Sequence, residues 1–154
     1  MSEPVVVYRR YGERPARDYV TGVWTRRIRW ASIGLMVVGV VAGLGGLAGG
    51  VDGSSSWELL GMLALWVVTQ VGIDLLSRHP RAVNYPTVLT SRTVQRVYRE
   101  GERMLVVVGA ASSLCFAGGV GMTLGAPGLP LMIGGLVLMF VGMIVGVVRL
   151  GNVS

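Results

Sequence analysis

Four long runs of apolar residues constrain this chain more than any other feature. They cover Trp30–Val51, Trp57–Leu76, Met104–Gly125 and Pro130–Val148, and none of them contains lysine or arginine. Each run is about 20 residues long, which is the length that an α-helix needs to cross a hydrocarbon core of about 30 Å. Helices of a soluble bundle would show a polar face, and these runs do not. We therefore predict an all-α polytopic membrane protein whose four transmembrane helices form two hairpins.

The four runs divide the 154 residues into five parts. These are a basic N-terminal segment with an interfacial helix (1–29), a first transmembrane hairpin (30–76), a basic loop with an amphipathic helix (77–103), a second hairpin (104–148) and a C-terminal segment (149–154). The first run begins too far along the chain, and is too long, for the core of a signal peptide, so we interpret it as a span. Each half passes from a basic amphipathic stretch to a glycine-rich span, a pattern consistent with a parallel duplication.

Arginine occurs on one side of the predicted spans only. Seven arginines precede the first span, six lie in residues 77–103 and Arg149 follows the fourth span, whereas the connections at 51–56 and 125–129 contain none. By the positive-inside rule we expect both termini and the long loop in the cytoplasm, and the protein in the cell membrane. The chain contains no lysine. We attribute this to the GC-rich genome of a bacterium or its phage, with bidentate phosphate binding as the alternative.

One stretch of the long loop, residues 90–105, is strongly amphipathic. Its arginines fall within about 60° of one another on a helical wheel, at Arg92, Arg96, Arg99 and Arg103. Apolar residues occupy the opposite face, at Val94, Val97, Tyr98 and Leu105. We predict a helix that begins at Thr90 or Ser91 and lies in the headgroup layer, with its arginines toward anionic phosphates. Glu100 and Glu102 flank this arginine stripe and reduce its charge. A partner protein or a nucleic acid is the alternative target, although no nucleic-acid motif accompanies the charge.

The segment before the first span repeats this pattern less regularly. In residues 18–30, Arg26 and Arg29 lie opposite an apolar face that includes Trp24, while Arg27 falls on that face. We predict a second interfacial helix here, with Arg26, Arg27 and Arg29 as lipid- or partner-binding groups. Residues 1–17 show no periodicity, and we interpret them either as a partner-binding tail or as a poorly ordered terminus.

Small residues inside the spans predict how the helices pack, because in lipid they let helix backbones approach closely. Candidate packing positions are Gly39 and Gly43 in the first span, Gly142 and Gly146 in the fourth, and a ladder in the third, at Gly109, Ser113, Ala117, Gly121 and Gly125. The second span is bulky. We expect the first, third and fourth spans to make close contacts through these small faces, either within one chain or between subunits.

Polar side chains in the second span are the remaining candidate site. Gln70, Asp74 and Arg78 follow one another at four-residue spacing and share a helix face with Trp66. One interpretation is a protonatable Asp74 in a polar groove, assisted by Gln70. The other is an Asp74–Arg78 pair that reaches the membrane edge, since Asp74 lies about one turn from the end of the span.

The sequence contains no pattern typical of a catalytic or metal site. His79 is the only histidine and Cys115 the only cysteine, and no phosphate-binding glycine loop or nucleophile motif occurs. We therefore expect no enzymatic activity, no cofactor or metal, and no nucleic-acid partner.

These observations together favour a non-catalytic membrane protein that acts by binding. It would be an accessory, assembly or regulatory subunit of a membrane complex, including the exclusion or immunity type. The expected partners are the anionic bilayer surface and other membrane protein subunits or further copies of the chain. The alternative is a small oligomeric transporter, channel or pore former that uses Asp74 and Gln70.

Overall fold

The computed structural model describes residues 5–8, 11–50, 53–85 and 88–153. Four long helices form a bundle: α1 (Val23–Ala48), α2 (Gly53–Arg78), α3 (Val94–Thr123) and α4 (Leu129–Val153). Two short 3-10 helices, η1 (Tyr11–Glu13) and η2 (Pro80–Ala82), lie in the connections. All four long helices are long and apolar enough to cross a membrane. The predicted all-α architecture with four spans is confirmed, and the chain is a multi-pass membrane protein.

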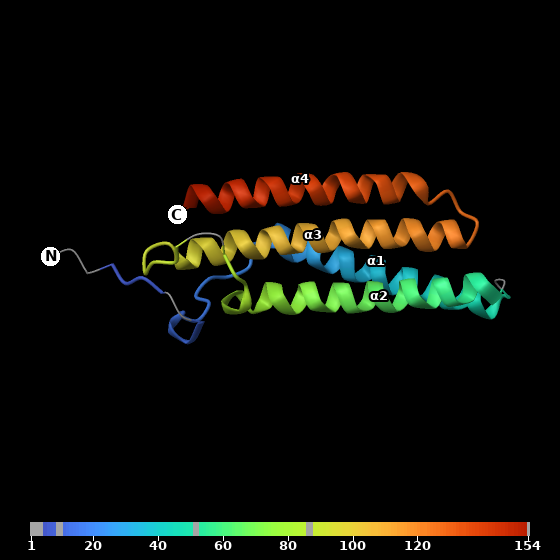
Figure 1. Ribbon diagram of the computed structural model, residues 1–154, viewed down its shortest axis with the longest axis horizontal. Helices are drawn as coiled ribbons and strands as arrows, with labels where there is room; N and C mark the ends of the chain where they lie inside the picture. Colours follow the sequence, from blue (N-terminus) through green and yellow to red (C-terminus); the bar gives the residue numbers. More distant parts are fainter. Residues whose placement is uncertain (1–4, 9–10, 51–52, 86–87, 154) are drawn as a thin grey trace.

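The four helices run alternately in opposite directions (Figure 1). α1 and α3 begin, and α2 and α4 end, at the same end of the bundle, which we call the arginine-rich end. α3 is the central helix, because it packs against α1, α2 and α4, whereas α4 packs chiefly on α3. Large apolar side chains cover the outer face of α4, where Phe140 is 62% and Ile144 is 63% exposed. Such a face suits a lipid environment, and polar solvent would not favour it.

α3 is longer than a membrane span requires. Its 30 residues extend about 45 Å at 1.5 Å per residue, against about 30 Å for a hydrocarbon core. The apolar part begins at Met104, so the preceding turns of α3 extend about 15 Å beyond it. The amphipathic stretch that we expected as a separate helix in the headgroup layer is therefore the first part of α3 and continues its axis. Similarly, α1 begins at Val23, and no separate interfacial helix precedes it in the described residues.

The apolar face of the α3 extension is buried in protein. Val94, Val97 and Tyr98 are at most 2% exposed, and they form a core cluster with Tyr85, Leu89 and Leu150. The expectation that these side chains enter the headgroup layer is wrong, because the long loop and the last turn of α4 cover them. The helix begins slightly later than predicted, although the Thr90 carbonyl still accepts a hydrogen bond from the Val94 amide, at 3.0 Å.

In the first hairpin, the glycines of α1 make room for large side chains of α2. A Cβ atom added to Gly39 would lie 2.3 Å from the ring of Trp66, and one added to Gly43 would lie 2.9 Å from Leu63. The rings of Trp66 and Phe116 stack with centroids 5.9 Å apart, which joins this contact to α3. The two α1 positions are thus packing positions as expected, but they face the bulky second span. We had expected them to face the small residues of the third and fourth spans.

In the second hairpin, glycine brings the backbones of α3 and α4 together. A Cβ added to Gly118 would lie 2.6 Å from the carbonyl oxygen of Gly128, and one added to Gly135 would lie 2.7 Å from that of Ala111. Further along α4, Gly142 and Gly146 make room for Val107 and Met104 respectively. The close approach of the third and fourth spans follows from these contacts within one chain.

The predicted ladder of the third span divides between several neighbours. Gly109 faces Ile73 and Gln70 of α2, Ser113 is buried in the bundle, and Ala117 packs on the cluster around Trp66. Gly121 lies near the α3–α4 connection. Gly125 is not in the helix, because α3 ends at Thr123 and Gly125 adopts a φ of +78° in the turn.

Candidate functional site

A buried carboxylate, Glu102, lies at the centre of the arginine-rich end. Its side chain is 1% exposed and accepts a charged hydrogen bond of 2.8 Å from the Arg29 guanidinium. Arg17 lies 3.6 Å from the other carboxylate oxygen, and the Thr21 hydroxyl donates to Glu102 at 2.9 Å. Glu102 therefore joins α3 to α1 and to the segment that precedes α1.

A second carboxylate, Asp74, extends the cluster to α2. It pairs with Arg78 at 2.8 Å and lies 3.4 Å from Nε of Arg29. Arg29 also donates to the Ser77 hydroxyl at 3.0 Å, and that hydroxyl donates to the Asp74 carbonyl at 2.8 Å. We call Arg17, Arg29, Asp74, Arg78 and Glu102 the ion cluster. A charge removed from water destabilises a fold unless it is paired, so the pairing of buried Arg29 with Glu102 and Asp74 links three helices.

The placement of Arg29 and Glu102 corrects two sequence expectations. Arg29 was expected to bind lipid or a partner together with Arg26 and Arg27, but its side chain is 12% exposed and points into the ion cluster. Glu102 was expected to lie beside the exposed arginine stripe, but it points inward. The spacing in the sequence indicates that both side chains point inward. Glu102 lies four residues after buried Tyr98, and residues four apart share a helix face. Arg29 likewise lies between Thr25 and Ser32 on the polar stripe of α1.

A second polar network lies deeper among the helices. The Gln70 side chain donates to the Ser32 hydroxyl at 3.0 Å and accepts from the Ser113 hydroxyl at 2.9 Å. The indole of Trp66 donates to Ser113 at 3.2 Å. Gln70 is thus bound to α1 and α3, and it lies on the same side of α2 as Asp74. A small cavity of about 10 Å³ between Gln70 and Asp74 has the size at which roughly one water molecule fits.

The segment before α1 is bound to the long loop and to α3. Tyr8 and Leu89 share a backbone hydrogen bond of 2.9 Å, and Ser91 and Val6 one of 2.8 Å. Gln95 bonds both the Asp18 amide and the Ala16 carbonyl. For residues 5–8 and 11–17 the interpretation as a poorly ordered terminus is therefore wrong, while Met1–Pro4, Arg9 and Arg10 lie outside the described residues.

Arg14 and Arg81 fasten the same segment to the long loop. Arg14 donates to the Arg81 and Val83 carbonyls, at 3.0 and 2.9 Å, and Arg81 donates to the Pro15 carbonyl at 2.8 Å. Tyr19 also packs here, and its pKa is raised above its usual value by burial and by the nearby Glu102 carboxylate. Its phenol is therefore uncharged at physiological pH, and it adds no charge to the ion cluster.

The arginine stripe stays on the surface. Arg92, Arg96, Arg99 and Arg103 are all exposed, although Arg99 lies over the Tyr19 ring at 5.4 Å and Arg103 pairs with Glu100 at 2.5 Å. Arg26 and Arg27 are also exposed, and Arg27 lies over the Trp24 ring at 5.3 Å. Because the other face of the α3 extension is buried, the fold holds the stripe in one orientation.

Comparison with protein-family models, with curated protein sequences and with solved structures finds no match for this chain. In the ranges that the structure describes, no group of three or more His, Cys, Asp and Glu side chains could hold a metal ion. The site is a partly buried ion cluster, centred on Glu102 and Arg29, beside a fixed surface of exposed arginines.

Proposed function

We propose that this protein is a non-catalytic four-span membrane protein that acts by binding, as an accessory, assembly or regulatory subunit of a membrane complex. Its docking surface is the outer part of the arginine stripe, Arg92, Arg96 and Arg99, and its partner there is a protein with an acidic surface. The observation that carries the proposal is the fixed orientation of the stripe on the α3 extension.

The geometry of α3 supports a protein partner for the outer arginines. The headgroup layer is about 7 Å thick on each side of the hydrocarbon core. If the core begins near Met104, Arg96 lies about 12 Å farther along the helix axis. Arg92 precedes Val94, the first residue of α3, which itself lies about 15 Å from Met104. These side chains therefore extend past the headgroups toward the aqueous phase. Only the inner end of the stripe, at Arg103, stays at headgroup level.

The bonding of the polar side chains in α2 supports binding over transport. A transporter would need Asp74 or Gln70 to face a path open to water. Asp74 is instead paired with Arg78 and Arg29, and Gln70 is bound to Ser32 and Ser113. Both groups contribute to holding the helices together, which is the role expected for satisfied polar groups inside a bundle.

The proposed orientation has the arginine-rich end in the cytoplasm, on the basis of the positive-inside rule. Cysteine labelling from outside the cell, in a Cys115→Ser background, tests it. A cysteine at exposed Ala126 should react with a membrane-impermeant reagent, and one at exposed Asn152 should not. The reverse pattern would contradict the orientation and would turn the proposed docking surface away from cytoplasmic partners.

Affinity purification of the full chain from its own host in mild detergent, after cross-linking, tests the function. The variant Arg92→Gln/Arg96→Gln/Arg99→Gln should lose a protein that cross-links to residues 92–99 in the wild type. The control Arg26→Gln/Arg27→Gln/Arg149→Gln removes the same number of charges from the same end and should retain it. Loss of the partner in both variants, or in neither, would contradict the proposal.

A further inference from the structure

A cleft runs along α3 between α1 and α4, beginning at the arginine-rich end. One cavity of about 190 Å³ lies between α3 and α4, and a second of about 290 Å³ lies between the first turns of α1 and the same two helices. The two cavities share Arg103, Val107 and Arg149 as lining residues. They are therefore neighbouring parts of one cleft, and the two arginines lie at its mouth.

The cleft continues deeper along α1. A third cavity of about 190 Å³ lies between Ile28, Ala31 and Leu35 of α1 and Ala110 and Leu114 of α3. It shares Ile28 with the second cavity. From Val23 to Leu35 the helix rises about 18 Å, which is close to the roughly 15 Å of hydrocarbon in one leaflet. The cleft, from its mouth to Leu35, thus stays within a single leaflet.

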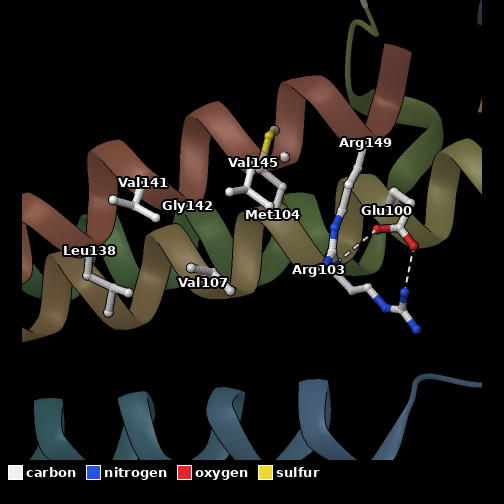
Figure 2. Close-up of a pocket in the computed structure, with 10 residues that line it drawn as sticks. Glu100, Arg103, Met104, Val107, Leu138, Val141, Gly142, Val145 and Arg149 are labelled. Carbon is white, nitrogen blue, oxygen red and sulfur yellow. Dashed lines mark hydrogen bonds and ion pairs between the residues drawn. The ribbon is translucent and has the colours of Figure 1, made fainter. Parts of the chain in front are cut away.

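The mouth of the cleft carries net positive charge. Glu100 lies between the two arginines, 2.5 Å from Arg103 and 3.9 Å from Arg149 (Figure 2). One carboxylate opposes two guanidinium groups, and each guanidinium has five N–H donors, so both retain donors for a further anion. Trp24 lines the same mouth and is 73% exposed, which suits an indole at headgroup level.

We infer that this cleft binds one anionic phospholipid. Its phosphate lies at Arg103 and Arg149, and one acyl chain lies along α1 past Ala31 and Ala110. A free phosphate would use only the mouth and would leave the apolar part without a function. A partner helix, about 10 Å across, is too wide for cavities of this size. The inference does not depend on the proposed protein partner, because it uses the inner end of the stripe and the faces of α1 and α4.

The test is native mass spectrometry of the full chain in mild detergent, with phosphatidylglycerol or phosphatidylcholine of the same acyl chains. The wild type should retain one phosphatidylglycerol, at least about fivefold more than phosphatidylcholine. The variant Arg103→Gln/Arg149→Gln should reduce phosphatidylglycerol to the phosphatidylcholine level. The control Arg92→Gln/Arg96→Gln, which removes the same charge outside the cleft, should leave the preference unchanged.

A second pair of variants tests the apolar part. Ala31→Leu/Ala110→Leu places extra side-chain atoms in the deeper cavity and should lower the retention of phosphatidylglycerol. The control Ala64→Leu, at an exposed position of α2, should leave the retention of phosphatidylglycerol unchanged. Equal retention of the two lipids by the wild type, or equal loss in both arginine variants, would overturn the inference. If retention falls with the mouth variant but not with the leucine variant, an anion alone occupies the mouth and the acyl-chain assignment is overturned.

Discussion

The two hairpins use glycine in different ways. In the first, Gly39 and Gly43 of α1 receive the side chains of Trp66 and Leu63. In the second, Gly118 and Gly135 bring one backbone against the other, so that a carbonyl oxygen occupies the space of a missing Cβ atom. Gly142 and Gly146 of α4 receive side chains of α3, as the α1 glycines receive those of α2, so the backbone contact is the feature that sets Gly118 and Gly135 apart. The difference matters because a side chain can move or be replaced, whereas a helix backbone cannot yield without moving the whole helix.

The largest expected effect concerns the charge that joins the two hairpins. Glu102→Gln leaves Arg29 buried with one counter-charge fewer, and we expect the free energy of unfolding in detergent to fall by about 3 kcal/mol or more. Glu100→Gln is the matched control, because Glu100 belongs to pairs with the exposed Arg103 and Arg149, and it should change stability by less than about 1 kcal/mol. Similar losses in the two variants would mean that the hairpins do not depend on the buried carboxylate.

The next effect tests the backbone contact of the second hairpin. Gly135→Ile should lower stability by about 2–3 kcal/mol, because the new side chain meets the backbone of α3. Gly134→Ile adds the same atoms one residue away, where a Cβ has no neighbour within 4 Å. Thermal unfolding in detergent compares the two. Equal melting temperatures would show that α4 does not pack on α3 through this face.

A smaller effect separates side-chain contacts from backbone contacts. Gly39→Ala should lower the free energy of unfolding by about 1–2 kcal/mol. In the Trp66→Leu background the same substitution should lower it by less, because the ring that the new methyl group meets is gone. Gly135→Ala should not be rescued by Cys115→Ala, since the Ala111 carbonyl and the Cys115 amide remain in place. Double-mutant cycles measured by equilibrium unfolding give both coupling energies. Equal coupling energies for the Gly39–Trp66 and Gly135–Cys115 pairs would contradict the distinction between side-chain and backbone contacts.

The smallest expected effect concerns the polar link between the hairpins inside the bundle. Ser113→Ala removes hydrogen bonds to Gln70 and Trp66, and such bonds between membrane helices are worth about 0.6 kcal/mol on average. Ser112→Ala, a partly buried neighbour, is the control for the substitution itself. A loss above about 2 kcal/mol for Ser113→Ala would make this network, and not the ion cluster, the main link between the hairpins.

The fold was predictable because length and apolar composition alone determine a membrane-spanning helix. The four runs became four helices, although α1 and α3 begin well before their runs, at Val23 and Val94, and the predicted Gly125 lies beyond the end of α3. The orientation of the amphipathic stretch could not be read in the same way. Its apolar face suits a membrane surface or a protein surface equally well, and the segment that covers it lies far away in the sequence.

The site was predictable only where it is local. The pair Asp74–Arg78 follows from four-residue spacing on one helix. Arg29 and Glu102 belong to helices that are distant in sequence, and their contact depends on how α1 docks beside α3. The divided ladder of α3 has the same cause, because spacing identifies small residues on a helix and does not identify which neighbour each one meets.

The binding of residues 5–8 and 11–22 to the loop and to α3 has a consequence for synthesis. Val6 bonds to a side chain 85 positions later, and Arg29 to one 73 positions later. At about 5–20 residues per second, the ribosome needs roughly 4–16 s to make that intervening chain. During this interval the N-terminal segment lacks its contacts with α3, and Arg29 lacks the Glu102 carboxylate. The first hairpin must therefore enter the membrane before its charges are fully paired, and the segment before α1 is among the last to reach its final position.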